Sequence, residues 1–222
     1  MNSSTSLLTL ISVVLLTNVA CSGGAESPSA PTSTLTPTTT VTASTTVGVQ
    51  AATSVRFSAQ AANFEAGALS YRWEFGDGET STDAAPAHIY SSPGTHTVVV
   101  TVTNSRQSAR AETSLTIYSV TGTWLSIGDT TTMYLTQSGS AITGEASEKN
   151  GPGEAPYSQC AISGYVEVGT PAVIFLTQPP CSHPRFAPLA PLDYRLNMTT
   201  DGQRLVGLAT EDGRTFQIAL RR

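Results

Sequence analysis

The sequence predicts an all-β protein with two domains, a β-sandwich followed by a small antiparallel up-and-down β-barrel. Apolar residues recur at every second position in many short runs, as they do in strands with one buried face. Turn residues separate these runs, and no segment shows a helical period of apolar residues. With 222 residues, the chain is long enough for two domains of ordinary size.

Residues 1–20 are predicted to be a signal peptide. Within them, residues 7–20 form an apolar run that is too short to span a bilayer reliably. Cys21 follows directly, and this arrangement resembles a bacterial lipoprotein signal, in which the cysteine becomes the new N-terminus and carries acyl chains. The segment differs from that pattern at Asn18, where Leu is usual, and residues 1–6 contain no Lys or Arg.

Two interpretations of this segment remain open, lipidation of Cys21 and ordinary secretory cleavage, and both export the mature protein. The resemblance implies a lipoprotein of the bacterial cell envelope, in the periplasm or on the surface, whose partner is the membrane that holds its lipid anchor. Residues 21–40 are rich in Ser, Thr and Pro without apolar periodicity, so we expect a disordered tether.

Residues 41–118 are predicted to form the sandwich, with a first edge strand at 41–52 and further strands at 54–59, 68–75 and 112–118. In the central strand Trp73 and Phe75 point to one face, and the strand stops at the turn Gly76-Asp77-Gly78. The run 96–102 has His96 and three valines on one face. Two such strands need a second sheet to cover their apolar faces. The predicted structural core is Trp73, Phe75 and Tyr90.

The stretch from Trp73 to Gly78, followed by Tyr90 and Pro93-Gly94, resembles the PKD (polycystic kidney disease) domain. This resemblance implies an immunoglobulin-like sandwich that serves as a non-catalytic spacer or contact module. His96 stands where the family usually has an aromatic residue such as Tyr, and we expect it to pack as a flat ring.

A calcium site is one interpretation of Asp77, Glu79 and Asp83, because loop carboxylates are suitable calcium ligands. Their spacing matches no recognised calcium loop, so we expect the Gly-Asp-Gly segment to be a turn and predict no metal site.

Residues 119–222 are predicted to form an eight-stranded antiparallel barrel. Asp-Gly pairs at 201–202 and 212–213 are strong hairpin signals, and consecutive hairpins remove their exposed edges by closing into a barrel. The expected strands are residues 122–126, 131–137, 141–147, 160–167, 172–178, 194–199, 204–210 and 215–220.

The opening Gly122-Thr123-Trp124 is similar to the start of the calycin group, which includes lipocalins, and the resemblance implies that Trp124 plugs one end of the barrel. We expect the interior-facing residues to include alternating sets on three strands. These sets are Met133 and Leu135; Ile162, Gly164 and Val166; and Val173, Phe175 and Thr177. A barrel of this size either fills its interior with side chains or holds one small ligand.

Cys160 and Cys181 are predicted to form a disulfide, because each lies near the open end of one hairpin and Cys21 belongs to the signal. A metal site formed by Cys160, Cys181 and His183 is the alternative. The loop 178–191 contains five prolines. It is a rigid connector, a lid over a barrel mouth or a partner-contact loop.

The composition argues against several functions. The net charge is −5 and Lys149 is the single lysine, so we expect no nucleic-acid partner. Common catalytic motifs such as G-x-S-x-G and H-E-x-x-H are absent from the sequence, so we predict neither an enzyme nor a cofactor. The prediction is a structural or adhesive module of the cell envelope that contacts extracellular protein or polysaccharide through the PKD domain. The alternative is a lipocalin-like binder of a small apolar ligand.

Overall fold

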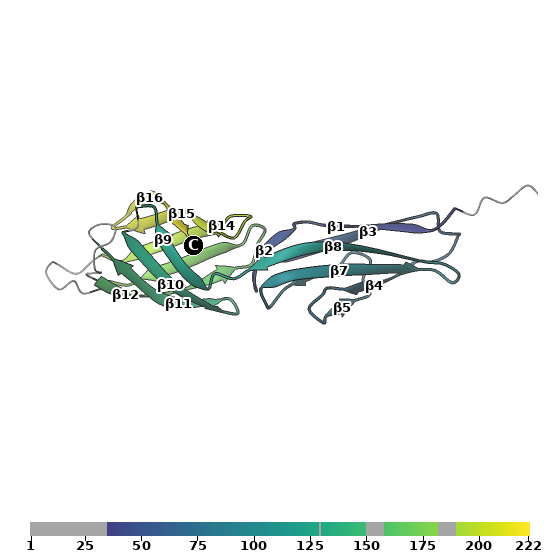
Figure 1. Ribbon diagram of the computed structural model, residues 1–222, viewed down its shortest axis with the longest axis horizontal. Helices are drawn as coiled ribbons and strands as arrows, with labels where there is room; N and C mark the ends of the chain where they lie inside the picture. Colours follow the sequence, from purple (N-terminus) through teal and green to yellow (C-terminus); the bar gives the residue numbers. More distant parts are fainter. Residues whose placement is uncertain (1–34, 129, 150–157, 182–189) are drawn as a thin grey trace, which may run out of the picture. The chain divides into compact units, whose positions relative to one another are not determined.

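The computed structural model describes residues 35–128, 130–149, 158–181 and 190–222 (Figure 1), which belong to one compact unit, Leu35–Arg222. Every helix or strand in these ranges is a β-strand. The predicted signal peptide, Cys21, most of the tether and His183 lie outside the described residues, as do positions 182–189 of the proline-rich loop.

The N-terminal half is a sandwich of two sheets, one with the strand order β1-β3-β6 and the other with the order β2-β8-β7-β4-β5. The pairs in both sheets are antiparallel except that of β2 with β8, which is parallel. The strands are β1 (Thr38–Ala43), β2 (Val47–Val49), β3 (Ser54–Ala62), β4 (Ser70–Glu74), β5 (Thr80–Ser81), β6 (Ala87–Ile89), β7 (Gly94–Thr103) and β8 (Ser108–Tyr118).

The start of the sandwich differs from the prediction in two ways. The expected first strand, 41–52, is divided, because β1 pairs with β3 in one sheet and β2 pairs with β8 in the other. In addition, residues 38–40 belong to β1 instead of the tether, since they pair with residues 60–62 of β3. Residues 38–40 are three consecutive threonines, so the sequence shows no alternation of apolar and polar residues at that point.

The sandwich core is built around aromatic rings. Trp73 is fully buried, and its indole N–H donates a hydrogen bond to the carbonyl oxygen of Asp83 at 2.8 Å. Phe57 packs against Trp73 and Phe75 with ring centroids 5.9 and 5.6 Å apart. Tyr90, which is 1% exposed, completes this group. Such rings bury a large apolar area in a small domain.

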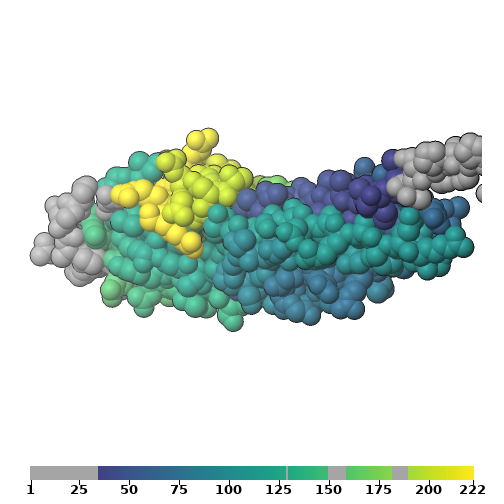
Figure 2. All heavy atoms as spheres, turned by 45° about the vertical axis from the view of Figure 1, so that its right-hand side comes forward, coloured from purple at the N-terminus to yellow at the C-terminus, as the bar shows by residue number. Residues whose placement is uncertain are grey.

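The C-terminal half is a closed barrel of eight antiparallel strands, in which β16 pairs with β9 to complete the circle. The C-terminal strands, yellow-green to yellow in Figure 2, contribute much of the barrel surface seen in that view. The strands are β9 (Gly122–Ser126), β10 (Thr131–Ser138), β11 (Ala141–Glu148), β12 (Ser158–Glu167), β13 (Val173–Gln178), β14 (Leu192–Met198), β15 (Arg204–Glu211) and β16 (Arg214–Arg221).

The register of β13 corrects one predicted set of interior residues. Ile174, Leu176 and Gln178 point inward and are at most 1% exposed, so Val173, Phe175 and Thr177 point outward. Both sets are largely apolar, so alternation alone did not separate them. As a result, an aromatic side chain, Phe175, lies on the outer surface of the barrel.

Three inward-facing glycines let neighbouring strands approach closely. A Cβ at any of these positions would lie about 2 Å from a carbonyl oxygen of the adjacent strand, a distance at which atoms overlap. Glycine is therefore required there, as is typical where strands bend sharply in small barrels. The three positions are Gly144 in β11, Gly164 in β12 and Gly207 in β15.

Hydrogen bonds also link the segment after β2 to the barrel within the same compact unit. The side-chain amide of Gln137 donates to the carbonyl oxygen of Gln50 at 2.9 Å, and its oxygen accepts from the Val120 N–H at 2.9 Å. The Gly169 N–H donates to the carbonyl oxygen of Ala52 at 3.0 Å. Gln137 is 8% exposed, so these polar groups are satisfied within the protein.

Candidate functional site

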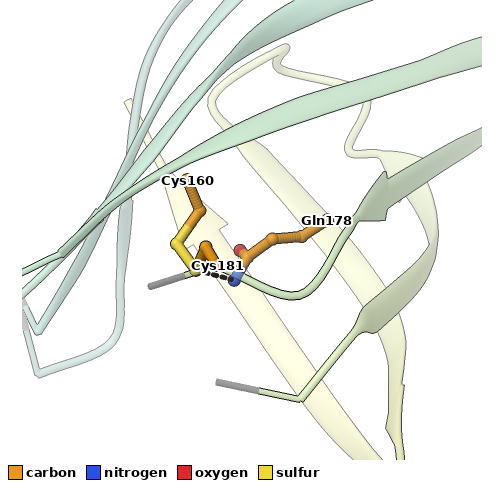
Figure 3. The surroundings of a disulfide bond; sticks show 3 residues. All are labelled: Cys160, Gln178 and Cys181. Carbon is orange, nitrogen blue, oxygen red and sulfur yellow. Dashed lines mark hydrogen bonds between the residues drawn. A yellow bond between two sulfur atoms is a disulfide. The ribbon is translucent and has the colours of Figure 1, made fainter. Parts of the chain in front are cut away.

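The predicted disulfide between Cys160 and Cys181 is confirmed, with the two Cα atoms 5.5 Å apart (Figure 3). Cys160 lies in β12 and Cys181 lies three residues beyond the end of β13. Because the two sulfur atoms are bonded to each other, neither can supply the thiolate that the alternative metal site or a nucleophile would need. The side chain of Gln178 reaches toward this bond, with its amide nitrogen 3.9 Å from the sulfur of Cys181.

The Gly76-Asp77-Gly78 segment is held by hydrogen bonds to Asp77. Both glycines have positive φ angles, 85° and 96°, which favour glycine. One carboxylate oxygen of Asp77 accepts from the Glu79 N–H at 3.0 Å, and the other lies 2.7 Å from His88 Nε2. The described residues contain no group of three or more His, Cys, Asp or Glu side chains that could hold a metal ion.

His88 belongs to a chain of stacked rings at this end of the sandwich. Its ring stacks on Phe75 with centroids 4.2 Å apart and meets Tyr90 edge-on at 4.6 Å, while Tyr90 stacks on His96 at 4.4 Å. The packing expected for His96 is thus what the structure shows. The Tyr90 hydroxyl donates to the carbonyl oxygen of Phe75 at 3.1 Å.

Burial and the hydrogen bonds and charge of Asp77 determine the pKa shifts in this cluster. Burial acts to raise the pKa of the Asp77 carboxyl, but the hydrogen bonds from His88 and Glu79 and the charge of His88 outweigh it and lower the pKa. Burial raises the pKa of the Tyr90 hydroxyl, and the charge of Asp77 raises it further. The hydrogen bonds to the Asp77 carboxylate therefore stabilise the turn.

Trp124 is fully buried at one end of the barrel, where its indole N–H donates to the Val120 carbonyl oxygen at 2.8 Å. The guanidinium of Arg222 lies 4.6 Å from the Trp124 ring centroid and also donates to the carbonyl oxygens of Ser119 and Thr121. Burial lowers the pKa of Arg222, although the charge of Tyr118 opposes this effect. This end of the barrel is therefore closed by an aromatic ring covered by a cation.

The outer face of the barrel carries a feature that the sequence analysis missed. Four outward side chains lie side by side across β12, β13, β14 and β15, and we call them the aromatic row: Tyr165, Phe175, Arg195 and Leu208. Tyr165 stacks on Phe175 with centroids 5.1 Å apart, and the Arg195 guanidinium lies 5.9 Å from the Phe175 ring centroid. Tyr165 is 52% exposed and Leu208 is 41% exposed.

Polar side chains flank the aromatic row on both sides. Two positions along the strands from the aromatic row lies a parallel row of outward residues, five with hydroxyl side chains and one aspartate. We call it the hydroxyl row: Thr143, Ser163, Thr177, Asp193, Thr210 and Thr215. On the other side is a groove of about 580 Å³, whose lining includes Leu208 and the amide side chains of Asn197 and Gln217. Stacking rings, hydroxyls and amides thus share one surface.

Large exposed hydrophobic side chains are concentrated in this half of the protein. Among the described residues, the sandwich exposes Leu35, Leu69 and Ile89. The barrel exposes Ile127, Tyr134, Tyr165, Val168, Val206, Leu208 and Phe216. Scattered exposed apolar residues are normal, but neighbouring ones mark contact surfaces. The barrel, and not the PKD-like half to which the sequence analysis assigned contact, therefore presents the stronger candidate surface.

The family of the N-terminal half is identified by a match to a family model. The model of the PKD domain family matches residues 29–118, so the chain contains a PKD domain, followed by the closed eight-stranded barrel. The match begins before Val41, where the sequence analysis had placed the start of the likeness.

Two curated relatives share the PKD segment. Collagenase ColA of Bacillus cereus is 42% identical over 65 residues, which are 28% of this chain and 7% of the collagenase. Pre-pro-metalloprotease PrtV of Vibrio cholerae is 29% identical over 94 residues, 39% of this chain and 10% of the protease. The chain thus spans a small part of either relative.

Solved structures give similar partial likenesses. The crystal structure of the PKD1 domain of Vibrio cholerae PrtV matches with 28% identity and a TM-score of 0.32, covering 37% of this chain and 98% of that domain. A structure described as a carbohydrate-binding module of the β-sandwich superfamily matches with 18% identity and a TM-score of 0.37, covering 85% of each chain. In the part of the chain that the structure describes, no helix is long and apolar enough to cross a membrane.

Proposed function

We propose that this protein is an exported, non-catalytic binding module in which the outer face of the barrel binds a polysaccharide and the PKD domain acts as a spacer. The observation that carries the proposal is the aromatic row on β12–β15. In this row Tyr165 stacks on Phe175, and the guanidinium of Arg195 lies over the Phe175 ring. The tether and lipidated Cys21 expected from the sequence would hold the module at the cell envelope.

A sugar ring offers C–H groups on its faces and hydroxyls around its edge, so its binding sites combine exposed aromatic rings with hydrogen-bonding side chains. The barrel surface has both. On the other side of Tyr165, the paired residue on β11 is Ala141. Its side chain is small, so there is room for a ligand beside the Tyr165 ring. The hydroxyl row and the amides of Asn197 and Gln217 provide donors and acceptors on the two flanks.

Charge favours a polysaccharide over a protein partner at this surface. The aromatic and hydroxyl rows together contain one cation, Arg195, and one anion, Asp193. The remaining members are rings, Leu208 and hydroxyl side chains. Protein interfaces of similar size are built around larger apolar centres with charged rims, so a neutral polymer rich in hydroxyls fits better.

The PKD domain supports the role of a spacer. The outward side chains of its larger sheet are mainly threonines and exposed ion pairs, such as Arg72 with Glu74 at 3.2 Å and Arg110 with Glu112 at 3.1 Å. Exposed pairs of this kind contribute little binding or folding energy. Export is supported by the Cys160–Cys181 disulfide, because such bonds persist in oxidising compartments.

Co-sedimentation of the exported full chain with insoluble polysaccharides tests the proposal. Peptidoglycan, chitin and cellulose cover three common neutral or weakly charged backbones. We expect saturable binding to at least one, and the Tyr165→Ala variant should bind roughly two- to tenfold more weakly, because an aromatic contact contributes about 0.5–1.5 kcal/mol.

The Tyr134→Ala variant is the matched control, because Tyr134 is similarly exposed, at 54%, but lies on β10 outside the aromatic row. It should bind like the unmodified chain. Equal weakening by the two substitutions, or no saturable binding to any of the polymers, would show that the aromatic row is not a polysaccharide site.

A further inference from the structure

A cavity of about 280 Å³ lies between β2 and two hairpins of the barrel, which join β12 to β13 and β14 to β15. We call it the junction cavity. All of its walls belong to the compact unit Leu35–Arg222. It is separate from the aromatic row, none of whose residues lines it. The apolar part of its lining consists of Val47, Val49, Tyr118, Pro171, Ala172 and Met198.

Packing and a hydrogen bond hold the walls of the junction cavity together. Val49 at the end of β2 and Ala52 just after it belong to the same cluster of buried side chains as the core of the barrel. The Gly169 N–H donates to the Ala52 carbonyl oxygen at 3.0 Å. Tyr118 lies against Gly202, where an added Cβ would overlap the Tyr118 ring. The cavity is therefore formed by segments that contact one another directly.

The polar groups on the β2 side of the junction cavity are already paired. The Thr45 hydroxyl donates to the Val47 carbonyl oxygen at 2.8 Å and accepts from the Val47 N–H at 3.2 Å. The Thr53 hydroxyl accepts from the Val49 N–H at 2.8 Å, and the Val49 carbonyl oxygen accepts from the Thr53 N–H at 3.0 Å. Because these groups are satisfied within the protein, this wall offers a ligand mainly apolar contacts.

Hydroxyls on the barrel side of the cavity are paired as well. The Thr199 hydroxyl donates to the Asp201 carboxylate at 2.6 Å, and this carboxylate also accepts from the Gln203 N–H at 3.0 Å. The Thr170 hydroxyl donates to the Ser54 carbonyl oxygen at 3.4 Å. No charged side chain is among the described residues that line the junction cavity. A charged ligand would therefore lose its hydration there without gaining a partner of opposite charge.

The size and surroundings of the junction cavity favour a small molecule over a protein partner. Among the described residues, none of the large exposed hydrophobic side chains lines it. Its apolar surface is therefore confined to the cavity, whereas a protein interface needs a broad apolar centre. An apolar cavity of about 150 Å³ holds benzene, so about 280 Å³ has room for two fused rings.

We infer that the junction cavity binds a small, uncharged apolar molecule of about two fused rings. The ligand would lie against the Tyr118 ring and the thioether of Met198, both of which favour contacts with flat rings. Ligand cavities commonly occur at such junctions between domains. The site adjoins β2, whereas the calycin likeness implied a ligand in the barrel interior. It is also independent of the polysaccharide site proposed for the outer face.

Calorimetric titration of the exported full chain at neutral pH tests the inference with three probes that share one ring system. 2-Naphthol is neutral, 2-naphthoate carries a negative charge and 2-naphthylmethylammonium carries a positive charge. We expect saturable binding of 2-naphthol and at least roughly tenfold weaker binding of both charged probes. Equal binding of either charged probe, or no saturable binding of 2-naphthol, would overturn the inference.

Variants that fill the junction cavity from its two walls assign the binding to it. Val47→Phe on β2 and Thr200→Phe on the barrel each add a ring at a lining residue that is at least partly exposed, so both variants should fold. Each should weaken 2-naphthol binding at least roughly tenfold. Thr136→Phe is the matched control, because Thr136 is exposed on β10 and does not line the cavity.

The control should bind 2-naphthol like the unmodified chain. Unchanged binding in both filling variants, or equal weakening in the control, would overturn the inference. The Tyr165→Ala variant, which should weaken polysaccharide binding, should leave 2-naphthol binding unchanged. Loss of 2-naphthol binding in that variant would place the probe on the aromatic row and would also overturn the inference.

Discussion

The Cys160–Cys181 disulfide gives the most quantitative prediction. Its two cysteines are separated by 21 residues in the sequence. Removing the bond releases a loop of that length in the unfolded chain, and the loop-closure model then predicts a loss of about 3 kcal/mol in the free energy of unfolding. Cys160 is 2% exposed, so replacing its sulfur also removes some packing.

The test compares the native protein with the Cys160→Ala, Cys181→Ala double variant by hydrogen exchange along a denaturant series. This method measures the free energy of opening separately for peptides from each half of the chain. We expect the free energy of opening to fall by about 3 kcal/mol in peptides of β12 and β13, because the bond joins β12 to the segment that follows β13. Reducing the native protein should produce a similar loss, because it opens the same loop without a substitution.

A loss below about 1 kcal/mol would refute the reasoning, since the loop-closure estimate for this separation is well above that value. An equal loss in peptides of β7 and β8, which belong to the sandwich, would also contradict it. In that case the bond would affect the unfolding of the whole chain and not of the barrel alone.

The remaining structural predictions concern one charge and one glycine. The pKa of the Asp77 carboxyl is lower in the folded protein than in the unfolded chain. Ionised Asp77 therefore adds to the free energy of unfolding above its unfolded-state pKa, and this contribution is lost as the pH falls through its folded-state pKa. The Asp77→Asn variant should therefore be less stable than the native protein at neutral pH, and the difference should shrink under acid, as measured by unfolding curves at a series of pH values. Gly164→Ala should cost about 1–3 kcal/mol by overpacking, because its Cβ would overlap the Phe175 carbonyl oxygen, whereas Ser163→Ala on the exposed outer face should cost little.

Each of these two predictions has a result that would contradict it. A stability difference for Asp77→Asn that is constant or grows toward low pH would show that the carboxylate is not stabilised in the folded protein. An equal cost for Gly164→Ala and Ser163→Ala in thermal unfolding would show that the close approach of β12 and β13 does not require glycine.

The sequence predicted most of the barrel correctly because its turns carry clear chemical signals. Asp212-Gly213 adopts positive φ angles of 46° and 75° and joins β15 to β16, as the Asp-Gly pair indicates. The strand 122–126 was predicted with the bounds found in the structure. Cys160 and Cys181 could be paired because both lie near the open end of one hairpin.

The candidate sites could not be predicted, because they depend on register and on strand order. In β13 both faces are largely apolar, and the inward set includes Gln178 while the outward set includes Phe175. A period of two therefore does not say which set faces the interior. The aromatic row also joins residues 165, 175, 195 and 208, which only the pairing of four strands brings together.

The division of the first sandwich strand was missed for a related reason. Residues 41–49 read as one alternating run, although the chain changes sheets within it.

The central claim is that the outer face of the barrel binds polysaccharide, and mapping the contact by NMR tests it most directly. A soluble oligosaccharide of the polymer that co-sediments with the chain would be titrated into isotopically labelled protein. The account predicts that backbone shifts change around Tyr165, Phe175 and Leu208, with β4, β7 and β8 of the sandwich unaffected. Shift changes confined to those sandwich strands would contradict the account and would show that the PKD domain binds the polysaccharide.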